Sequence, residues 1–315
     1  MPSHAVRQGE TVARACVDPV EPLSRPVVIV GGGTMGSGIA QRFLQAGYRV
    51  MCVEVDEDRA SRAGAAISAG LQRWARKTEH PERLGEARNR LSLHVGGAPT
   101  VDPELVVETV PENAGLKRSM LAQYSARYPS TTLATNTSAL SVGDLAEAVR
   151  HPERFLGMHF FNPVPVSSLL EIVRGPQTGA EAVEAAHQHA RRLSLTPVEV
   201  RDSPGFATSR LGIAIGLEAI RMVEEGVASP SDIDTAMVLG YRLPIGPLEL
   251  SDRVGLDVRL AIAQHLHAHL GERFRPPALL GTMVRDGLLG VKTGRGFYMW
   301  DGGNKVPVMS GGSNG

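Results

Sequence analysis

A short apolar run that leads directly into a glycine-rich turn constrains the fold of this chain more than any other feature. Val27–Val30 reads as a strand, and Met35–Ala46 reads as the helix that follows it. The residues of the turn are Gly31, Gly32, Gly33, Thr34, Met35 and Gly36. Their GxGxxG spacing is a weak signal alone but a specific one between a strand and a helix. Because these glycines permit a tight turn, the approach of a pyrophosphate and close helix–strand packing, the segment predicts a dinucleotide-binding βαβ unit.

Strands and helices alternate from Val27 to about Val200. The predicted strands are Val27–Val30, Val50–Val53, Leu105–Val107, Thr132–Ala134, Phe155–His159, Leu169–Val173 and Val198–Val200. The predicted helices include Met35–Ala46, Arg59–Lys77, Leu116–Tyr128 and Ala180–Leu193. Several strands are unbroken apolar runs, which is typical of a parallel sheet buried on both faces. The pattern predicts an α/β Rossmann-type doubly wound sheet, forming a dinucleotide-binding domain over residues 26–202.

The pattern changes after the turn at residues 202–205, beyond which nearly every segment reads as helix or loop. We expect an all-α C-terminal domain over residues 203–300 that serves substrate binding and dimerisation. Between Leu211 and Val223 only Glu218 and Arg221 are charged. Because a helix that is apolar on nearly all sides must be covered on nearly all sides, we expect a homodimer, with burial inside one large subunit as the alternative. Residues 1–25 are expected to form a flexible leader and residues 301–315 a flexible tail.

The charge balance argues against a general affinity for polyanions. Lysine plus arginine and aspartate plus glutamate both number 33, so the whole chain attracts neither nucleic acid nor an anionic membrane. The two cysteines, Cys16 and Cys52, argue against a disulfide framework and favour a reducing, cytoplasmic location. No apolar stretch approaches the roughly 18 residues that indicate a membrane span. The leader lacks the apolar block of a signal peptide, and no metal site is predicted.

An acid at the end of the second strand indicates which dinucleotide binds. Glu54 lies 18 residues after Gly36. A carboxylate at this position accepts hydrogen bonds from the adenosine ribose hydroxyls and repels a 2′-phosphate, which favours NAD over NADP. Asp56 is a rival for the role, and a solvated turn acid is the simpler interpretation of either. FAD, which can use the same opening turn, is a minor alternative.

Three segments carry side chains suited to proton transfer. Residues 135–138 (Thr-Asn-Thr-Ser) follow one strand, residues 159–163 (His-Phe-Phe-Asn-Pro) end another, and Glu171 lies inside a third. Ligands of such sheets bind at the carboxyl ends of the strands. A carboxylate within an apolar strand is costly without a partner. Because oxidation of a secondary alcohol needs a base for the hydroxyl proton, we predict His159 as that base and Glu171 as the residue that orients it.

Together with segments elsewhere, these residues resemble the 3-hydroxyacyl-CoA dehydrogenase family in its single-function 3-hydroxybutyryl-CoA form. The matching segments are VVIVGGGTMGSGIA, ETVPENAGLK, ATNTSALS, HFFNPVPVSSLLEIV, DSPGF, DIDTAMVLG, GPLELSDRVGLD and KTGRGFY. They follow the family order from about Val27 to Tyr298. The resemblance implies NAD-dependent oxidation of an (S)-3-hydroxyacyl-CoA to the 3-ketoacyl-CoA, or the reverse, with a short acyl chain and a place in fatty acid metabolism.

Carried over position by position, the resemblance implies further site residues. The cofactor would be contacted by Glu112, Lys117, Ser138 and Lys292. Ser138 would also hydrogen-bond the 3-oxygen of the substrate, with Asn162 in the same substrate site. Lys77 would meet the CoA phosphates, with Arg73 one turn earlier on the same helix face. Solvated surface charge is the simpler interpretation of the last two residues.

The chain departs from the family at several functional positions. Ser209 stands where the family usually has an asparagine that helps to orient the catalytic group and substrate, so Ser209 must act through a shorter hydroxyl or a bridging water. Glu54 replaces the commoner aspartate, and Gly70 replaces a CoA-contacting serine of some members. Ser167 and Ser168 replace a bulkier Met-Lys pair, which alters the acyl pocket.

Two alternative functions stay open at this point. The first is the same chemistry on a carboxylated or carrier-protein-bound hydroxyacyl group, such as 3-hydroxyadipyl-CoA or a hydroxymalonyl-carrier protein. Ser209 and the pair Ser167 and Ser168 leave room for it. The second is a non-catalytic NAD-binding structural protein, against which the presence of Ser138, His159 and Glu171 argues.

Overall fold

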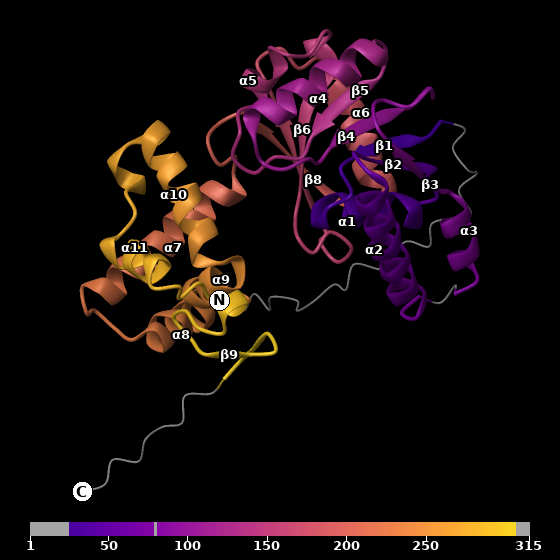
Figure 1. The fold of residues 1–315 in the computed structure, drawn as a ribbon. Helices are drawn as coiled ribbons and strands as arrows, with labels where there is room; N and C mark the ends of the chain where they lie inside the picture. Colours follow the sequence, from indigo (N-terminus) through magenta and orange to yellow (C-terminus); the bar gives the residue numbers. More distant parts are fainter. Residues whose placement is uncertain (1–24, 79–80, 307–315) are drawn as a thin grey trace, which may run out of the picture.

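The computed structural model describes residues 25–78 and 81–306. Figure 1 shows two lobes, a sheet flanked by helices in indigo to pink and a bundle of helices in orange to yellow. This arrangement confirms the predicted fold class, a Rossmann-type sheet followed by a helical unit. The expected leader, apart from Arg25, and the expected tail beyond Val306 lie outside the described residues.

The sheet of the first lobe has eight strands in the order β3-β2-β1-β4-β5-β6-β7-β8. The strands are β1 (Val27–Val30), β2 (Val50–Glu54), β3 (Leu91–Val95), β4 (Leu105–Glu108), β5 (Thr132–Thr135), β6 (Phe155–Phe160), β7 (Leu169–Arg174) and β8 (Thr196–Arg201). The strands from β3 to β6 pair in parallel and have the order expected of a dinucleotide-binding sheet. β7 pairs antiparallel with β6 and parallel with β8.

Helices cover both faces of this sheet. They are α1 (Thr34–Gln45), α2 (Glu57–Ala75), α3 (Arg83–Asn89), α4 (Ala114–Arg127), α5 (Val142–Ala146) and α6 (Ala180–Arg192). Val27 and Ile29 of β1 belong to the core formed with α1, α2, α3 and α6, whereas Val28 and Val30 belong to the core formed with α4 and α5. Because side chains alternate along a strand, an unbroken apolar run serves both cores.

The second lobe is helical. Its elements are α7 (Thr208–Glu224), α8 (Pro230–Tyr241), α9 (Pro247–Val254), α10 (Leu256–Leu270) and α11 (Ala278–Arg285), followed by a hairpin of β9 (Trp300–Asp301) and β10 (Asn304–Lys305). A third apolar core, which includes Ile213, Leu248 and Leu266, joins these helices. No helix in the described ranges is long and apolar enough to cross a membrane.

Two buried aspartates hold the matching segments of the helical lobe together through hydrogen bonds. Asp234 accepts hydrogen bonds of 2.8 Å each from the Leu248 and Glu249 amides at the start of α9, and another from the Tyr298 hydroxyl. Asp252 accepts from the amide of Tyr298 at 2.9 Å and from the indole of Trp300 at 2.9 Å. These bonds tie three of the matching segments into one structural unit.

The structure differs from the sequence prediction at three places. β3 was not predicted, because it is an edge strand in which Leu93 and Val95 remain 44% and 41% exposed, so it lacks a continuous apolar run. α2 ends at Ala75, so Lys77 follows the helix instead of lying one turn after Arg73 within it. The flexible tail was expected from residue 301, but the β9–β10 hairpin continues to Lys305, whose ammonium pairs with Glu249 at 2.6 Å.

Candidate active site

The glycine turn after β1 has the shape that a phosphate-binding turn requires. Gly31 has a φ of +96°, a left-handed conformation that glycine adopts without strain. A Cβ on Gly36 would lie 1.8 Å from the Gly31 carbonyl oxygen, so only glycine lets α1 begin this close to the strand. A Cβ on Gly33 would meet nothing within 4 Å, so the space beside that backbone is open. The turn thus closes against the strand while leaving room for a ligand.

The N-terminus of α1 is suited to an anion. The N-cap residue of α1 is Gly33, which has no side chain to cap the helix, and the first turn of the helix has no acidic residue. Its backbone amides and the helix dipole therefore favour a phosphate. Glu54 lies beside the turn, where its carboxylate accepts a 2.5 Å hydrogen bond from the Gly32 amide. These residues fit a dinucleotide, and the contact of Glu54 with its ribose stays a prediction.

The strand register places the remaining candidate segments along the same sheet edge. Val30 pairs with Glu108, and Glu108 pairs with Thr135, so β1, β4 and β5 end level with one another. Thr135 in turn pairs with Gly157, two residues before His159. Neighbouring strands lie about 4.8 Å apart, so β1 and β6 are separated by roughly 14 Å, a span that an extended dinucleotide bridges. The turn, the segment around Ser138 and His159 therefore share one edge.

The segment that carries Ser138 is held by Glu112. The Glu112 carboxylate accepts hydrogen bonds from the Thr137 hydroxyl, from the Ser138 amide at 3.1 Å and from the Ala139 amide at 3.3 Å. The family resemblance implies that Glu112 contacts the cofactor, and that contact stays a prediction. The structure adds that Glu112 fixes the backbone at Ser138.

Lys117 is fully buried and its donors are engaged within the protein. Its ammonium lies 2.9 and 3.0 Å from the two carboxylate oxygens of Glu108, and it also donates to the carbonyl oxygens of Val110 and Asn136. Burial raises the pKa of Glu108, although Lys117 and the hydrogen bond from Thr135 act in the opposite direction. The pair supports the loops that follow β4 and β5. A contact between Lys117 and the cofactor stays a prediction.

His159 and Glu171 meet across the antiparallel pair of β6 and β7. The two residues lie directly opposite each other in the register, and His159 Nδ1 lies 2.7 Å from Glu171 Oε2. Both side chains are buried. The imidazole ring also packs against Phe161, with ring centroids 4.4 Å apart, and against Phe206, at 5.7 Å. The structure therefore brings together the two residues that the sequence pairs as base and orienting carboxylate.

Glu171 is held in its ionised form by donors from the helical lobe. Its Oε1 accepts from the backbone amides of Thr208, at 2.9 Å, and Ala207, at 3.2 Å, where α7 begins. Its Oε2 accepts from the Thr208 hydroxyl at 3.0 Å as well as from His159. Burial alone would raise the pKa of Glu171, but the hydrogen bonds from His159 and Thr208 outweigh it and lower that pKa below its ordinary value.

Several other predicted residues make no hydrogen bond or ion pair with His159 or Glu171 among the described residues. Lys292 forms an ion pair with Asp257 in the helical lobe. Arg73 and Lys77 are exposed at and beyond the end of α2. Asn162 and Ser209 make no hydrogen bond through their side chains among the described residues. The cofactor and substrate roles of all five stay predictions.

Two threonines that no sequence pattern singles out support the site. The Thr109 hydroxyl donates to the carbonyl oxygen of Gly31 at 2.6 Å and so braces the glycine turn. Thr208 contacts Glu171 through both its amide and its hydroxyl. Both lie inside matching or adjoining segments, yet neither is distinguishable from a surface threonine without the strand register.

Gly70, which replaces a serine of some members, lies where α2 packs against α1. A Cβ at this position would lie 2.1 Å from the side-chain oxygen of Gln41, so a larger residue would require the Gln41 side chain to move.

Family models match nearly the whole described chain. The NAD binding domain of 3-hydroxyacyl-CoA dehydrogenase matches residues 26–203, and the C-terminal domain matches residues 205–300. The chain belongs to the 3-hydroxyacyl-CoA dehydrogenase family. It is therefore an NAD-dependent oxidoreductase, and its cofactor is NAD.

Individual relatives agree with this membership. A probable 3-hydroxybutyryl-CoA dehydrogenase of Bacillus subtilis is 38% identical over 280 residues, covering 88% of this chain and 98% of the relative. The mitochondrial hydroxyacyl-coenzyme A dehydrogenase of Rattus norvegicus is also 38% identical, covering 88% and 92%. The crystal structure of (S)-3-hydroxybutyryl-CoA dehydrogenase from Ralstonia eutropha superposes with a TM-score of 0.81 at 36% identity, covering 88% of this chain and 99% of that chain.

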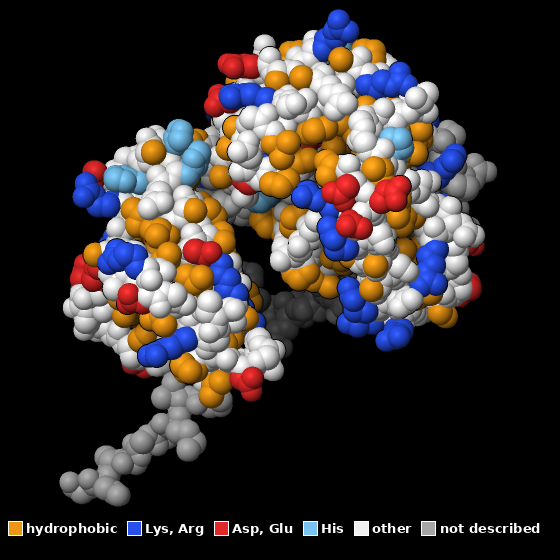
Figure 2. Space-filling view, viewed as in Figure 1, with side chains coloured by type: hydrophobic (Ala, Val, Ile, Leu, Met, Phe, Trp, Pro, Cys, Tyr) orange, Lys and Arg blue, Asp and Glu red, His pale blue; other side chains and the backbone are white. Residues whose placement is uncertain are grey.

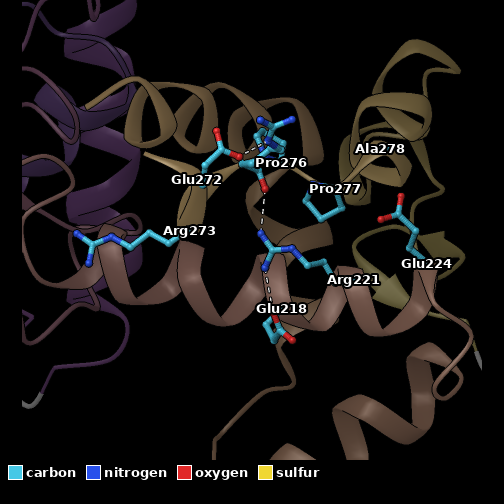
Figure 3. Close-up of a pocket in the computed structure, with 9 residues that line it drawn as sticks. Glu218, Arg221, Glu224, Glu272, Arg273, Pro276, Pro277 and Ala278 are labelled. Carbon is cyan, nitrogen blue, oxygen red and sulfur yellow. Dashed lines mark hydrogen bonds and ion pairs between the residues drawn. The ribbon is translucent and has the colours of Figure 1, made fainter. Parts of the chain in front are cut away.

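A surface cavity of about 550 Å³ on the helical lobe is separate from these segments (Figure 3). It is lined by Glu218, Arg221, Glu224, Glu272, Arg273, Arg275, Pro276, Pro277 and Ala278. Most of its charges are engaged with one another or with the backbone: Arg221 donates to Glu218 and to the Arg275 carbonyl oxygen, each at 2.9 Å, and Arg275 pairs with Glu272. No site residue named above lines it, and we assign it no role in the reaction.

Proposed function

We propose that this protein oxidises the 3-hydroxyl of a short-chain (S)-3-hydroxyacyl-CoA, such as 3-hydroxybutyryl-CoA, with NAD, or reduces the corresponding 3-ketoacyl-CoA with NADH. The observation that carries the proposal is the buried 2.7 Å contact between His159 and Glu171 at the same sheet edge as the glycine turn. The names of the Bacillus subtilis and Ralstonia eutropha relatives support the short acyl chain.

Glu171 fixes the proton on His159. An ionised carboxylate only accepts hydrogen bonds, so Nδ1 of the imidazole carries the proton that it donates, and Nε2 keeps a lone pair. Nε2 takes the hydroxyl proton of the substrate, and the Glu171 carboxylate stabilises the imidazolium that forms. Bound NAD supplies the hydride acceptor. Ser138, whose backbone is held by Glu112, donates to the 3-oxygen as it becomes a carbonyl, and Asn162 contacts the substrate beside it.

The two lobes divide the binding tasks in this proposal. Residues 26–202 hold NAD and carry the substrate-contacting residues named here, and residues 203–300 complete the substrate site and form the dimer contact. Lys292 reaches the cofactor from the helical lobe, and Arg73 and Lys77 meet the CoA phosphates; their surface positions support these roles. The space-filling view shows a hollow between the lobes, where an extended thioester would lie (Figure 2).

We also propose that two copies of the chain form a homodimer through their helical lobes. Apolar side chains of this lobe that a single chain leaves uncovered include Leu211, Leu239 and Tyr241, which are 64%, 74% and 77% exposed. Exposed apolar surface of this kind favours a protein partner. We also place the protein in the cytoplasm, because the buried free thiol of Cys52 suits a reducing compartment.

Turnover of a substrate panel tests the proposed function. NADH absorbance is followed after addition of acetoacetyl-CoA, longer 3-ketoacyl-CoA thioesters, a carboxylated 3-ketoacyl-CoA and a carrier-protein-bound 3-ketoacyl group. The highest kcat/KM is expected for acetoacetyl-CoA. A higher kcat/KM for the carboxylated or carrier-bound substrate would replace the proposed substrate class. Absence of NADH oxidation with every member would reject the proposed activity.

A further inference from the structure

The Thr208 hydroxyl and the catalytic histidine share one oxygen atom of Glu171. His159 Nδ1 lies 2.7 Å from Oε2, and Thr208 Oγ1 lies 3.0 Å from the same Oε2. Because an ionised carboxylate only accepts hydrogen bonds, the Thr208 hydroxyl must donate here. Oε2 thus accepts two hydrogen bonds, one from Thr208 and one from His159, the proposed base of the reaction.

The backbone of Thr208 fixes this hydroxyl in place. Thr208 is the first residue of α7, and its amide donates to Glu171 Oε1 at 2.9 Å. Thr208 therefore donates a hydrogen bond to each oxygen of the carboxylate, one from its backbone amide and one from its side chain. The neighbouring Ser209 points elsewhere, since successive residues of a helix are rotated by about 100°. Among the described residues its hydroxyl makes no hydrogen bond.

We infer that Thr208 is a positioning residue that sets the basicity of the His159–Glu171 pair through its hydroxyl, and that it takes the orienting part which the sequence assigns to Ser209. The inference rests on the proposed function in taking His159 as the proton acceptor. A donor on Oε2 withdraws charge from the atom that faces the imidazole, so the carboxylate holds the imidazolium less tightly.

Thr208→Val tests this inference, because valine keeps the shape of threonine and removes the hydroxyl. Thr208→Ser keeps the hydroxyl and serves as the matched control. Without the donor, the acid limb of the kcat/KM profile for hydroxyacyl-CoA oxidation is expected to move to higher pH by about 0.5 to 1 unit, an amount that follows from losing one hydrogen bond to a charged acceptor. KM for NAD is expected to stay within about twofold, since the glycine turn is untouched. Thr208→Ser is expected to reproduce the wild-type profile.

An NMR titration of the His159 ring supplies a readout that does not depend on turnover. The ring signal is assigned by its loss in His159→Gln and is followed against pH in the wild type, Thr208→Val and Thr208→Ser. The titration midpoint is expected to rise in Thr208→Val alone. If Thr208→Val does not fold, Thr208→Ala removes the same donor with a smaller side chain and is titrated in its place.

The outcomes separate this inference from the proposed function. An unchanged midpoint in the variants that lack the hydroxyl would overturn the inference even if the wild type reduces acetoacetyl-CoA. If the titration midpoint of His159 shifts in Ser209→Ala and not in Thr208→Val, then Ser209 and not Thr208 is the orienting residue. A raised midpoint in a protein that turns over none of the panel would support the role of Thr208 and reject the substrate.

Discussion

A single carboxylate inside an apolar strand, Glu171, is the residue on which the site depends most. It is fully buried, and it is tolerated there because four donors from His159, Ala207 and Thr208 surround its two oxygens. Two of these residues open α7, so the carboxylate also links the sheet to the helical lobe. Its chemistry and its structural role are therefore inseparable.

Replacing Glu171 with glutamine is expected to reduce both turnover and stability. The amide has the size of the carboxylate but no negative charge, and its NH2 group opposes the donors that surround it. We expect kcat to fall by about 10²- to 10⁴-fold, since His159 loses the partner that fixes its tautomer. We expect the free energy of unfolding at neutral pH to fall by about 1 to 3 kcal/mol. Steady-state kinetics and urea unfolding measure the two effects.

The pH dependence of that stability difference has a definite sign. The pKa of Glu171 in the folded protein is lowered from its ordinary value of 4.5, because the hydrogen bonds from His159 and Thr208 outweigh the effect of burial. The stability gained from its ionised form is therefore fully present above about pH 4.5 and is lost as the pH falls through the folded-state pKa. The gap between wild type and E171Q should narrow in acid. A gap that widened with falling pH would show that Glu171 is not ionised in the folded protein.

At the scale of elements, β1, the glycine turn and α1 form the unit whose function follows most directly from its geometry. Gly36 is needed for packing, since a Cβ would overlap the Gly31 carbonyl oxygen, whereas Gly33 faces open space. Gly36 therefore serves the stability of the turn, and Gly33 serves the binding of a ligand.

The pair of variants Gly33→Ala and Gly36→Ala tests this separation. Gly36→Ala should lower the free energy of unfolding by more than about 3 kcal/mol, because the strand and helix must move apart. Gly33→Ala should leave the free energy of unfolding within about 0.5 kcal/mol of wild type. It should still weaken NADH binding by about tenfold or more, since the methyl group fills space meant for the pyrophosphate. Denaturant unfolding and NADH fluorescence titration provide the measurements. Wild-type NADH affinity in Gly33→Ala would contradict the placement of the phosphates.

The sequence predicts most elements of the sheet because their side chains are buried on both faces. Val27–Val30 is apolar throughout for that reason, and Phe155–Phe160 is fully buried, with His159 as its only titratable residue. The edge strand β3 escapes prediction, since Leu93 and Val95 are partly exposed and no apolar run results. The pairing of His159 with Glu171 is also predictable, because a buried carboxylate requires a partner. Thr208 is not predictable, since its contact depends on how α7 packs against β7, and that long-range register leaves no local pattern.

At the scale of the whole molecule, the apolar surface of the helical lobe requires explanation. The sequence between Leu211 and Val223 predicts a helix in need of cover on nearly all sides, and the structure leaves Leu211 and Ile215 exposed at 64% and 42%. Leu239 and Tyr241 of α8 add to this uncovered surface. A second copy of the chain would cover it, as proposed above.

Leu239→Glu is expected to shift the protein from dimer to monomer. Leu239 is 74% exposed, so the substitution should leave the fold of the subunit intact while placing a charge in the proposed contact. Leu93→Glu, on the edge strand of the other lobe, is the matched control and should leave the molecular mass unchanged. Sedimentation velocity on the wild type and both variants distinguishes the cases. A monomeric wild type, or a dimer that survives Leu239→Glu and dissociates with Leu93→Glu, would contradict the proposed contact.

The proposed reaction depends on one imidazole acting opposite the nicotinamide of a bound dinucleotide. The most direct test is to compare acetoacetyl-CoA-dependent NADH oxidation by the wild type and by His159→Gln, with NADH affinity measured in parallel. We predict that kcat falls by about 10³-fold in His159→Gln, while the dissociation constant for NADH is unchanged. Near-wild-type turnover by His159→Gln would show that His159 is not the base of the reaction.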